Sequence, residues 1–132
     1  MNWIAWIVLF VSLQWIKTTE DFIWQNRIII YSGKGDFSSW QSEARIQDLT
    51  DRKLLYFHFK DGKLLNSNYK GKVDEKSFLN KLGLEKNSSE KWVLVGLDGG
   101  IKKAGEDIPV LYDIFKTIDA MPMRQSEIKR RD

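Results

Sequence analysis

Apolar runs separated by polar loops predict strands alternating with helices along the chain. Three short runs, at residues 27–31, 53–59 and 92–97, are rich in β-branched, aromatic or leucine side chains, which predicts buried strands. The second run is apolar on both faces, so we expect it to lie at the centre of a sheet or under helices. A shorter edge strand is expected at residues 101–103, after the Asp-Gly-Gly turn signal at residues 98–100.

Helical signals fill the intervals between these strands. Asp36 or Ser38 is expected to cap a helix that runs to about Leu49. Asp74 is expected to open a shorter helix, and Gly83 suits the left-handed position that follows the end of a helix.

The last helix has the most regular apolar stripe. We expect Pro109 in its first turn, with Asp107 just ahead as a cap. Pro122 is expected to end or kink this helix, and residues 125–132 form either a short surface helix or a frayed tail. The stripe consists of side chains spaced three and four residues apart, Leu111, Ile114, Phe115 and Ile118.

The resulting order is β-α-β-α-β-β-α. The first β-α-β unit predicts two parallel neighbouring strands, and the Gly-rich turn at residues 98–100 predicts an antiparallel hairpin. Leu64 and Leu65 are expected to pair at most briefly with the second strand. The predicted fold class is therefore α/β, with a mixed four-stranded sheet, helices on its faces and a thioredoxin-like arrangement.

Residues 3–16 form an almost wholly apolar segment at the start of the chain. The segment is shorter than the roughly 20 residues of a membrane-spanning helix, and its length suits the apolar part of a secretory signal. We expect residues 1–17 to be a signal peptide or, as the alternative, an uncleaved anchor; a helix packed on the domain is a third possibility. Residues 18–132 are expected to form one exported domain, periplasmic or secreted, that contacts a membrane only through residues 3–16 if they are retained.

The composition excludes several chemistries. The chain has no cysteine, which excludes thiol–disulfide oxidoreductase and peroxiredoxin activity. With one histidine, His58, placed in an apolar strand, we expect no metal site and no cofactor, and a hydrogen-bonded structural role for that side chain. The net charge of +3 has no accompanying basic face interleaved with aromatic residues, so nucleic acid is not an expected partner.

The Gly-rich loop at residues 32–39 is the first candidate site. It follows the first strand and precedes a helix, where catalytic thioredoxins carry their reactive cysteine. Lys34, Ser38 and Ser39 are candidates for a weak anion site, because backbone N–H groups at a helix N-terminus attract anions. The alternative is a plain turn. This alternative is favoured, because most helix N-termini bind no ligand.

Two parts of the chain resemble a known family. One is residues 24–30 (WQNRIII); the other is residues 95–102 (VGLDGGIK) together with residues 118–125 (IDAMPMRQ). Both are similar to the uncharacterised domain-of-unknown-function 4174 family, whose thioredoxin-like members are bacterial exported proteins, with related copies in animal sushi-repeat and coiled-coil-labelled extracellular proteins. The resemblance covers roughly residues 22–129 and implies the fold and export, without an established activity.

Three charged residues of those motifs are the second candidate site. Asp119 near a helix C-terminus opposes the helix dipole unless it has a cationic partner. Arg124 or Lys102 would supply that partner, and a structural ion pair is favoured over a ligand-facing site.

The leading functional prediction is an exported, non-catalytic thioredoxin-like module that binds a protein or a component of the cell envelope. The alternative is an enzyme with non-thiol chemistry that uses Lys102, Asp119 and Arg124, or the loop at residues 32–39.

Overall fold

The computed structural model describes residues 16–83 and 90–131. The predicted signal or anchor segment therefore lies outside the described residues, except for its last two positions. Ile16 and Lys17 form a short strand, β1 (Ile16–Lys17), which pairs in parallel with β5 (Lys72–Val73). Within the described ranges, no helix has the length and apolar character needed to cross a membrane.

The main sheet has five strands in the order β4-β3-β2-β6-β7. β2 runs parallel to β3 and antiparallel to β6, and β6 and β7 form the expected antiparallel hairpin. The prediction of four strands was wrong, because residues 63–67 pair with β3 over most of their length rather than briefly. The strands are β2 (Arg27–Ser32), β3 (Leu54–Lys60), β4 (Lys63–Ser67), β6 (Lys91–Val95) and β7 (Ile101–Gly105).

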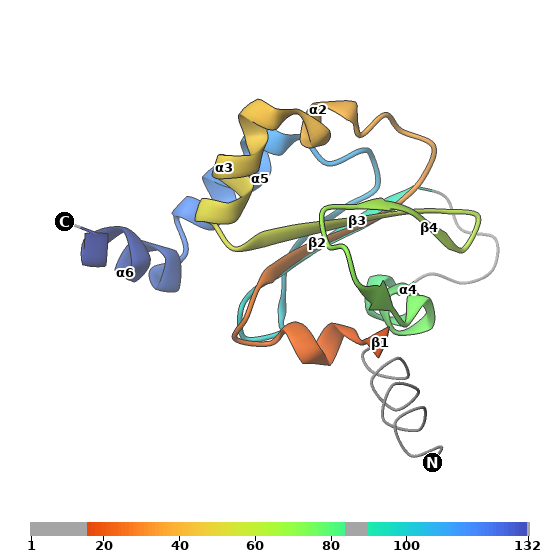
Figure 1. Ribbon diagram of the computed structural model, residues 1–132, viewed down its shortest axis with the longest axis horizontal. Helices are drawn as coiled ribbons and strands as arrows, with labels where there is room; N and C mark the ends of the chain where they lie inside the picture. The colour runs from red at the N-terminus through yellow and green to blue at the C-terminus, as the bar shows by residue number, and fades with distance from the viewer. Residues whose placement is uncertain (1–15, 84–89, 132) are drawn as a thin grey trace, which may run out of the picture.

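Helices cover both faces of this sheet (Figure 1). One face carries α2 (Ser38–Gln41), α3 (Glu43–Asp51) and α5 (Leu111–Asp119). The other face carries α4 (Glu75–Leu82) and a short 3-10 helix, η1 (Thr19–Phe22). This mixed sheet between helical layers is consistent with the predicted thioredoxin-like α/β fold.

Alternation along β2 separates two apolar cores. Ile29 and Tyr31 pack toward α2, α3 and α5, whereas Ile28 and Ile30 pack toward α4 and η1. All of these side chains are buried, as expected for a central strand covered on both faces.

Two helix boundaries differ from the prediction. The helix expected from residue 36 or 38 to 49 is interrupted at Ser42, whose extended backbone (ψ 145°) separates α2 from α3. α5 begins at Leu111 rather than at Pro109, because Val110 is still extended and Asp107 provides no cap. The residue that precedes α2 is Phe37, so the cap predicted at Asp36 or Ser38 was wrong. Asp74 precedes α4 as predicted, and Gly83 adopts a left-handed conformation after it, with φ 78°.

The C-terminal motif forms a helix break followed by a second helix. α5 ends at Asp119, and α6 (Pro122–Arg131) begins at Pro122. Proline suits the first position of a helix, because an N–H group at that position would have no partner within the helix. The predicted tail is thus an ordered helix, which lies at one end of the molecule in Figure 1.

Candidate functional site

The candidate residues lie at opposite ends of β2. Arg27 opens this strand beside the helix ends that carry Asp119 and Arg124, and Ser32 closes it before the Gly-rich loop. Six residues of extended chain place these ends about 16 Å apart. Lys34, Ser38 and Ser39 therefore form no common site with Asp119 and Arg124.

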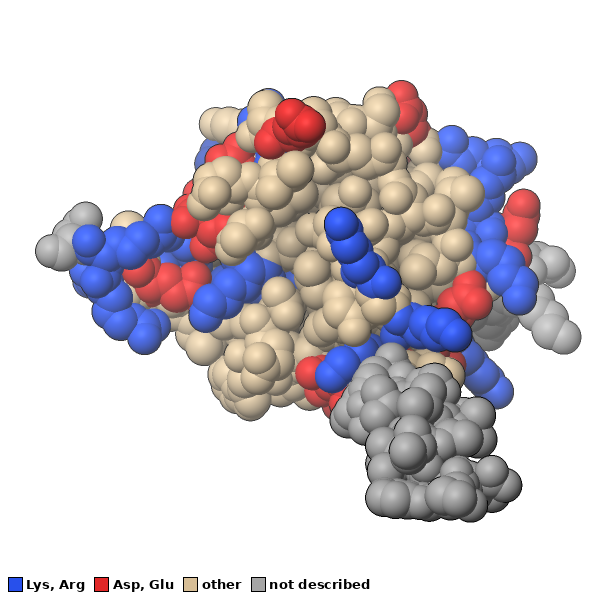
Figure 2. All heavy atoms as spheres, in the orientation of Figure 1, with Lys and Arg blue, Asp and Glu red and all other residues tan. Residues whose placement is uncertain are grey.

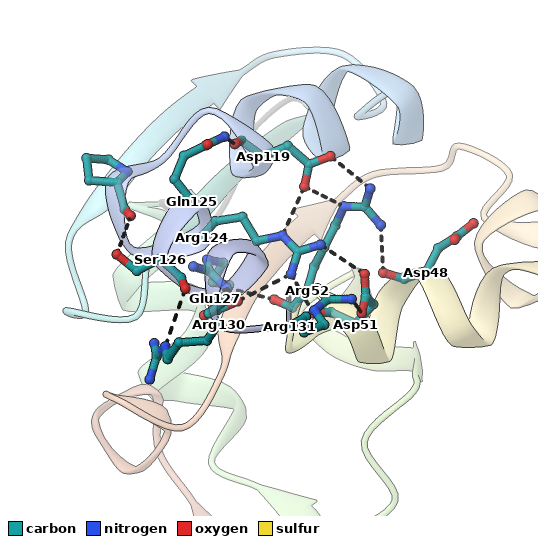
Figure 3. A network of polar contacts seen from close by, with 12 residues as sticks. Asp48, Asp51, Arg52, Asp119, Arg124, Gln125, Ser126, Glu127, Arg130 and Arg131 are labelled. Carbon is teal, nitrogen blue, oxygen red and sulfur yellow. Dashed lines mark hydrogen bonds and ion pairs between the residues drawn. The ribbon is translucent and has the colours of Figure 1, made fainter.

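Charged side chains from four parts of the chain form a connected network at the Arg27 end (Figure 3). They come from the start of β2, the end of α3, the end of α5 and from α6. We call this network the charged cluster: Arg27, Asp51, Arg52, Asp119, Arg124, Glu127 and Arg131.

Arg124 is the centre of the charged cluster. Its side chain is 4% exposed, and its guanidinium donates to three carboxylates and one carbonyl. Nη2 lies 2.9 Å from Asp51 Oδ2, and Nε lies 3.1 Å from Asp119 Oδ1. Nη1 donates to the Asp51 carbonyl at 3.0 Å and to Glu127 at 3.4 Å. These contacts fix α6 to the ends of α3 and α5.

Arg52 completes the coordination of Asp119. Its Nη2 lies 2.9 Å from Asp119 Oδ2 and its Nε 3.1 Å from Oδ1, a two-point pairing. The same guanidinium lies 4.2 Å from the centroid of the Phe115 ring, a cation–π contact. Asp119 therefore has two cationic partners, which offset its unfavourable position at the C-terminus of α5.

Arg27 joins the charged cluster to the sheet. Its side chain is 1% exposed, and Nη1 donates to the Arg52 carbonyl at 2.9 Å and to Glu127 Oε1 at 3.3 Å. Its Nε is buried without a hydrogen-bond partner among the described residues. A buried arginine at the start of an apolar strand thus ties that strand to the C-terminal helix.

The charges of the cluster stabilise one another. Burial raises the pKa of Asp119, but the hydrogen bonds and charges of Arg52 and Arg124 outweigh it, so the net pKa is lowered. The same balance, with Arg124 and Arg131 as donors, lowers the pKa of Asp51. Both carboxylates are therefore held ionised near neutral pH, which suits permanent ion pairs and not proton transfer.

Lys102 is not part of the charged cluster. Its Nζ lies 2.8 Å from Asp98 Oδ2, and the other oxygen of Asp98 accepts the Gly100 N–H at 2.9 Å. The proposed Asp119–Lys102 pair was therefore wrong, whereas the Asp119–Arg124 pair is present. Lys102 stabilises the turn between β6 and β7, where Gly99 adopts φ 84°.

The Gly-rich loop at the other end of β2 already has an anion of its own. The Asp36 carboxylate accepts the Ser38 N–H at 2.8 Å and the Ser38 hydroxyl at 3.0 Å. The helix that follows, α2, has one turn only, which limits the dipole available to an external anion. Lys34 and Ser39 are exposed, and the Lys34 N–H donates to Glu90 at 3.4 Å. These contacts favour the plain-turn alternative.

Stacked rings fill the space beneath this loop. Phe37 stacks on Trp40, Tyr31 and His58 with centroid distances of 4.8, 5.3 and 5.1 Å. His58 is buried and its Nε2 lies 2.8 Å from the Gly33 carbonyl, which confirms the expected hydrogen-bonded role. We call these rings, with Tyr56, the aromatic stack.

Tyr31 fixes the loop above the aromatic stack. Its hydroxyl accepts the Gly35 N–H at 2.9 Å. Burial raises the pKa of Tyr31, the Gly35 hydrogen bond opposes this, and the nearby Glu90 carboxylate adds to the increase. The phenol therefore stays neutral at physiological pH. It serves as a hydrogen-bonding group of the fold at the end of β2.

Five members of the charged cluster were absent from the predicted site: Arg27, Asp51, Arg52, Glu127 and Arg131. Asp51, Arg52 and Glu127 have no individual signal, because ordinary surface helices carry such residues in abundance. Arg27 had one: an arginine leading directly into three isoleucines must be buried or lie at a strand end. Burial of that charge requires an anionic partner, which turns out to be Glu127.

Neither end of β2 offers ligands for a metal ion. The carboxylates of the charged cluster are paired with arginines, and no group of three or more potential ligands occurs among residues 16–83 and 90–131. The charged cluster holds α6 against the ends of α3 and α5, which is a structural role.

Comparison with known proteins identifies a family but no characterised relative. The model of a family described as Domain of unknown function (DUF4174) matches residues 18–127, most of the chain. No curated protein and no solved structure matches significantly.

Proposed function

We propose that this chain, which belongs to the family described as Domain of unknown function (DUF4174), is an exported, non-catalytic module that binds a component of the cell envelope. The observation that carries the proposal is the closed state of both ends of β2. A catalytic site needs polar groups that are free to meet a substrate. In the charged cluster and the aromatic stack, the polar groups instead form hydrogen bonds and ion pairs with other residues of the domain.

The Gly-rich loop supports a non-catalytic role most directly. This loop occupies the place of the reactive thiol in a thioredoxin-like fold, and the chain has no cysteine. The Asp36 carboxylate accepts the Ser38 N–H at the start of α2, and the Tyr31 hydroxyl accepts the Gly35 N–H of the loop. A nucleophile, an electrophile and an open approach for substrate are therefore not assembled there.

Export is supported by the apolar segment of residues 3–16. A stable domain with a filled core and an ordered C-terminal helix is suited to act as a rigid binding module on the far side of a membrane.

Protease accessibility tests the export proposal. The full chain is produced in bacterial cells, the outer membrane is permeabilised, and protease is added. We expect the full chain to be digested, while a matched chain lacking residues 3–16 and a cytoplasmic marker stay intact. Protection of the full chain together with the marker would disprove export.

Chemical cross-linking in the same cells tests the binding role. The exported chain should give a discrete cross-linked product that the chain lacking residues 3–16 does not form. Cross-linking confined to random, concentration-dependent products would count against a specific envelope component.

A further inference from the structure

Two arginines of the charged cluster bind carboxylates through the same edge of the guanidinium group. At this edge, the Nε–H and one Nη2–H point in the same direction and can donate two parallel hydrogen bonds to an anion. In Arg52, both groups bind Asp119, with Nε at 3.1 Å and Nη2 at 2.9 Å. In Arg124, Nε binds Asp119 at 3.1 Å and Nη2 binds Asp51 at 2.9 Å. Carboxylates therefore occupy this edge in both residues.

Arg27 is more deeply buried than either of them, yet the same edge of its guanidinium has no partner. Its side chain is 1% exposed, compared with 4% for Arg124 and 15% for Arg52. Its Nη1 donates to the Arg52 carbonyl and to the Glu127 carboxylate. Nε is buried without a hydrogen bond, and Nη2 donates to no described residue. Because an unpaired buried donor of a charged group is strongly unfavourable, this edge requires a partner.

The charges around Arg27 favour an anion over a water molecule as that partner. Arg27 and Arg124, the two most buried cations of the cluster, share the Glu127 carboxylate. The whole cluster contains four arginines and three carboxylates, which leaves one positive charge in excess. Carbonyl groups at the end of α3 also accept arginine N–H groups, but they carry only partial charges. The neighbouring Asp48 carboxylate is paired with Arg45.

The surface next to the charged cluster adds further positive charge. Lys53, whose carbonyl accepts the Arg27 N–H, and Lys129 and Arg130 on α6 are exposed. The Asp98 carboxylate, at the turn between β6 and β7, is paired with Lys102. Figure 2 shows basic side chains gathered at the end of the molecule that carries α6, with acidic side chains between them. An anion is therefore attracted to this end of the molecule.

We propose that the Nε–Nη2 edge of Arg27 binds one small monovalent anion, chloride, which completes the charged cluster. The burial of Arg27 restricts the site to an anion of this size and excludes phosphate or an acidic peptide. Only the folded chain places this edge beside Glu127 and the end of α3, so the anion stabilises the fold. The inference goes beyond the proposed function, since it requires no envelope component.

Thermal melts of the wild-type protein test the site directly. The full chain is melted near neutral pH in sodium chloride and in sodium gluconate of equal ionic strength. We expect the melting temperature to be about 4 °C higher in chloride, because gluconate is too large for the site. In NMR spectra of chloride, the protein should broaden the chloride line, and bromide, a competing anion, should narrow it again.

Three variants assign the effect to Arg27. Arg27→Lys keeps the charge but removes the Nε–Nη2 edge, so it should lose both the chloride-dependent stabilisation and the line broadening. Arg52→Lys is the matched control: it loses the same edge, which Asp119 already occupies, and should keep the chloride response at a lower melting temperature. Glu127→Gln removes the carboxylate that competes for Arg27 and should tighten chloride binding about ten-fold. Circular dichroism shows which variants are folded.

Two results in the wild type would overturn the anion site together: equal melting temperatures in the two salts and an unbroadened chloride line. They would leave water as the partner of Nε. A chloride response that persists in folded Arg27→Lys would also overturn it. Asp132 lies outside the described residues and supplies a further control. A chloride response seen only in Asp132→Asn would show that a carboxylate of the chain itself takes the place of the anion. None of these outcomes bears on export.

Discussion

The two ends of β2 are closed by different physical means. At the Arg27 end, arginines and carboxylates from α3, α5 and α6 hold the chain together through the charged cluster. At the Ser32 end, stacked rings of the aromatic stack and a hydrogen bond from the Gly-rich loop to Tyr31 hold the chain together. Residue types that often carry catalysis occur at both ends, yet at each end their polar groups are bonded within the fold.

The comparison shows why these two ends should respond differently to change. The charged cluster joins segments that are distant in the chain, so losing one central charge weakens several ion pairs at once. The aromatic stack joins residues 31–40 to β3 through shape, so it should be sensitive to added volume and insensitive to charge.

The largest effect is expected for Arg124→Ala. This change removes the shared partner of Asp51 and Asp119 and leaves both carboxylates partly buried beside α6. Asp51 and Asp119 keep Arg131 and Arg52 as partners, so we expect the loss of the charge-assisted hydrogen bonds to lower the unfolding free energy by about 3 kcal/mol. Urea unfolding followed by circular dichroism measures the loss.

The matched control for Arg124→Ala is Arg45→Ala. Arg45 forms a comparable pair with Asp48 at 3.3 Å, but both side chains are exposed. Its removal should cost only about 0–1 kcal/mol. Equal losses for the two variants would show that the charged cluster contributes no more than a surface pair.

Gly35→Ala should destabilise the loop at the Ser32 end of β2, because the added methyl group has no space there. An added Cβ would lie 2.6 Å from Ile108 Cδ1 and 2.6 Å from the Tyr31 hydroxyl oxygen, which the core holds in place. Overpacking of this kind costs about 1–3 kcal/mol. Gly100→Ala is the control, since its nearest neighbour is the surface carboxylate of Asp98 at 3.3 Å. A thermal melt in which both variants match the wild type would refute tight packing of the loop.

Acid should weaken the charged cluster through Asp51 and Asp119. Both carboxyl pKa values are lowered in the folded protein, so the unfolded chain binds protons at a higher pH than the folded one. Their stabilising contribution is therefore complete above the ordinary aspartate pKa of about 3.9 and is lost as the pH falls below it.

The double variant Asp51→Asn/Asp119→Asn sharpens this test. It cannot lose those two contributions, so its unfolding free energy should change less than that of the wild type between neutral pH and about pH 3. Asp61→Asn, at an exposed turn, should follow the wild type. Parallel pH profiles for all three proteins would show that the charged cluster does not set the acid sensitivity.

Most of the fold was predictable because its signals are local. The run of three isoleucines, the Asp61-Gly62 and Asp98-Gly99 turns and the glycine after α4 each encode their own conformation. The break in the helix at Ser42 was not predictable in this way. The apolar spacing continues through that point, and no proline or glycine between residues 36 and 50 marks the end of α2.

The charged cluster was only partly predictable because its partners are distant. The Asp119–Arg124 pair spans five residues, and the dipole at the end of α5 requires a cation there. Asp51 meets Arg124 across 73 residues, and Arg27 meets Glu127 across 100, distances over which one sequence carries no pairing information.

Lys102 provides the smallest expected effect and a test of that limit. The sequence grouped it with Asp119, but its ammonium group binds Asp98 in an exposed pair four residues away. Lys102→Ala should therefore cost about 0–1 kcal/mol, and the loss should disappear in about 1 M salt. In a double-mutant cycle, Lys102→Ala should show coupling to Asp98→Ala and none to Asp119→Ala. Coupling to Asp119 would restore the original grouping and place the β6–β7 turn within the charged cluster.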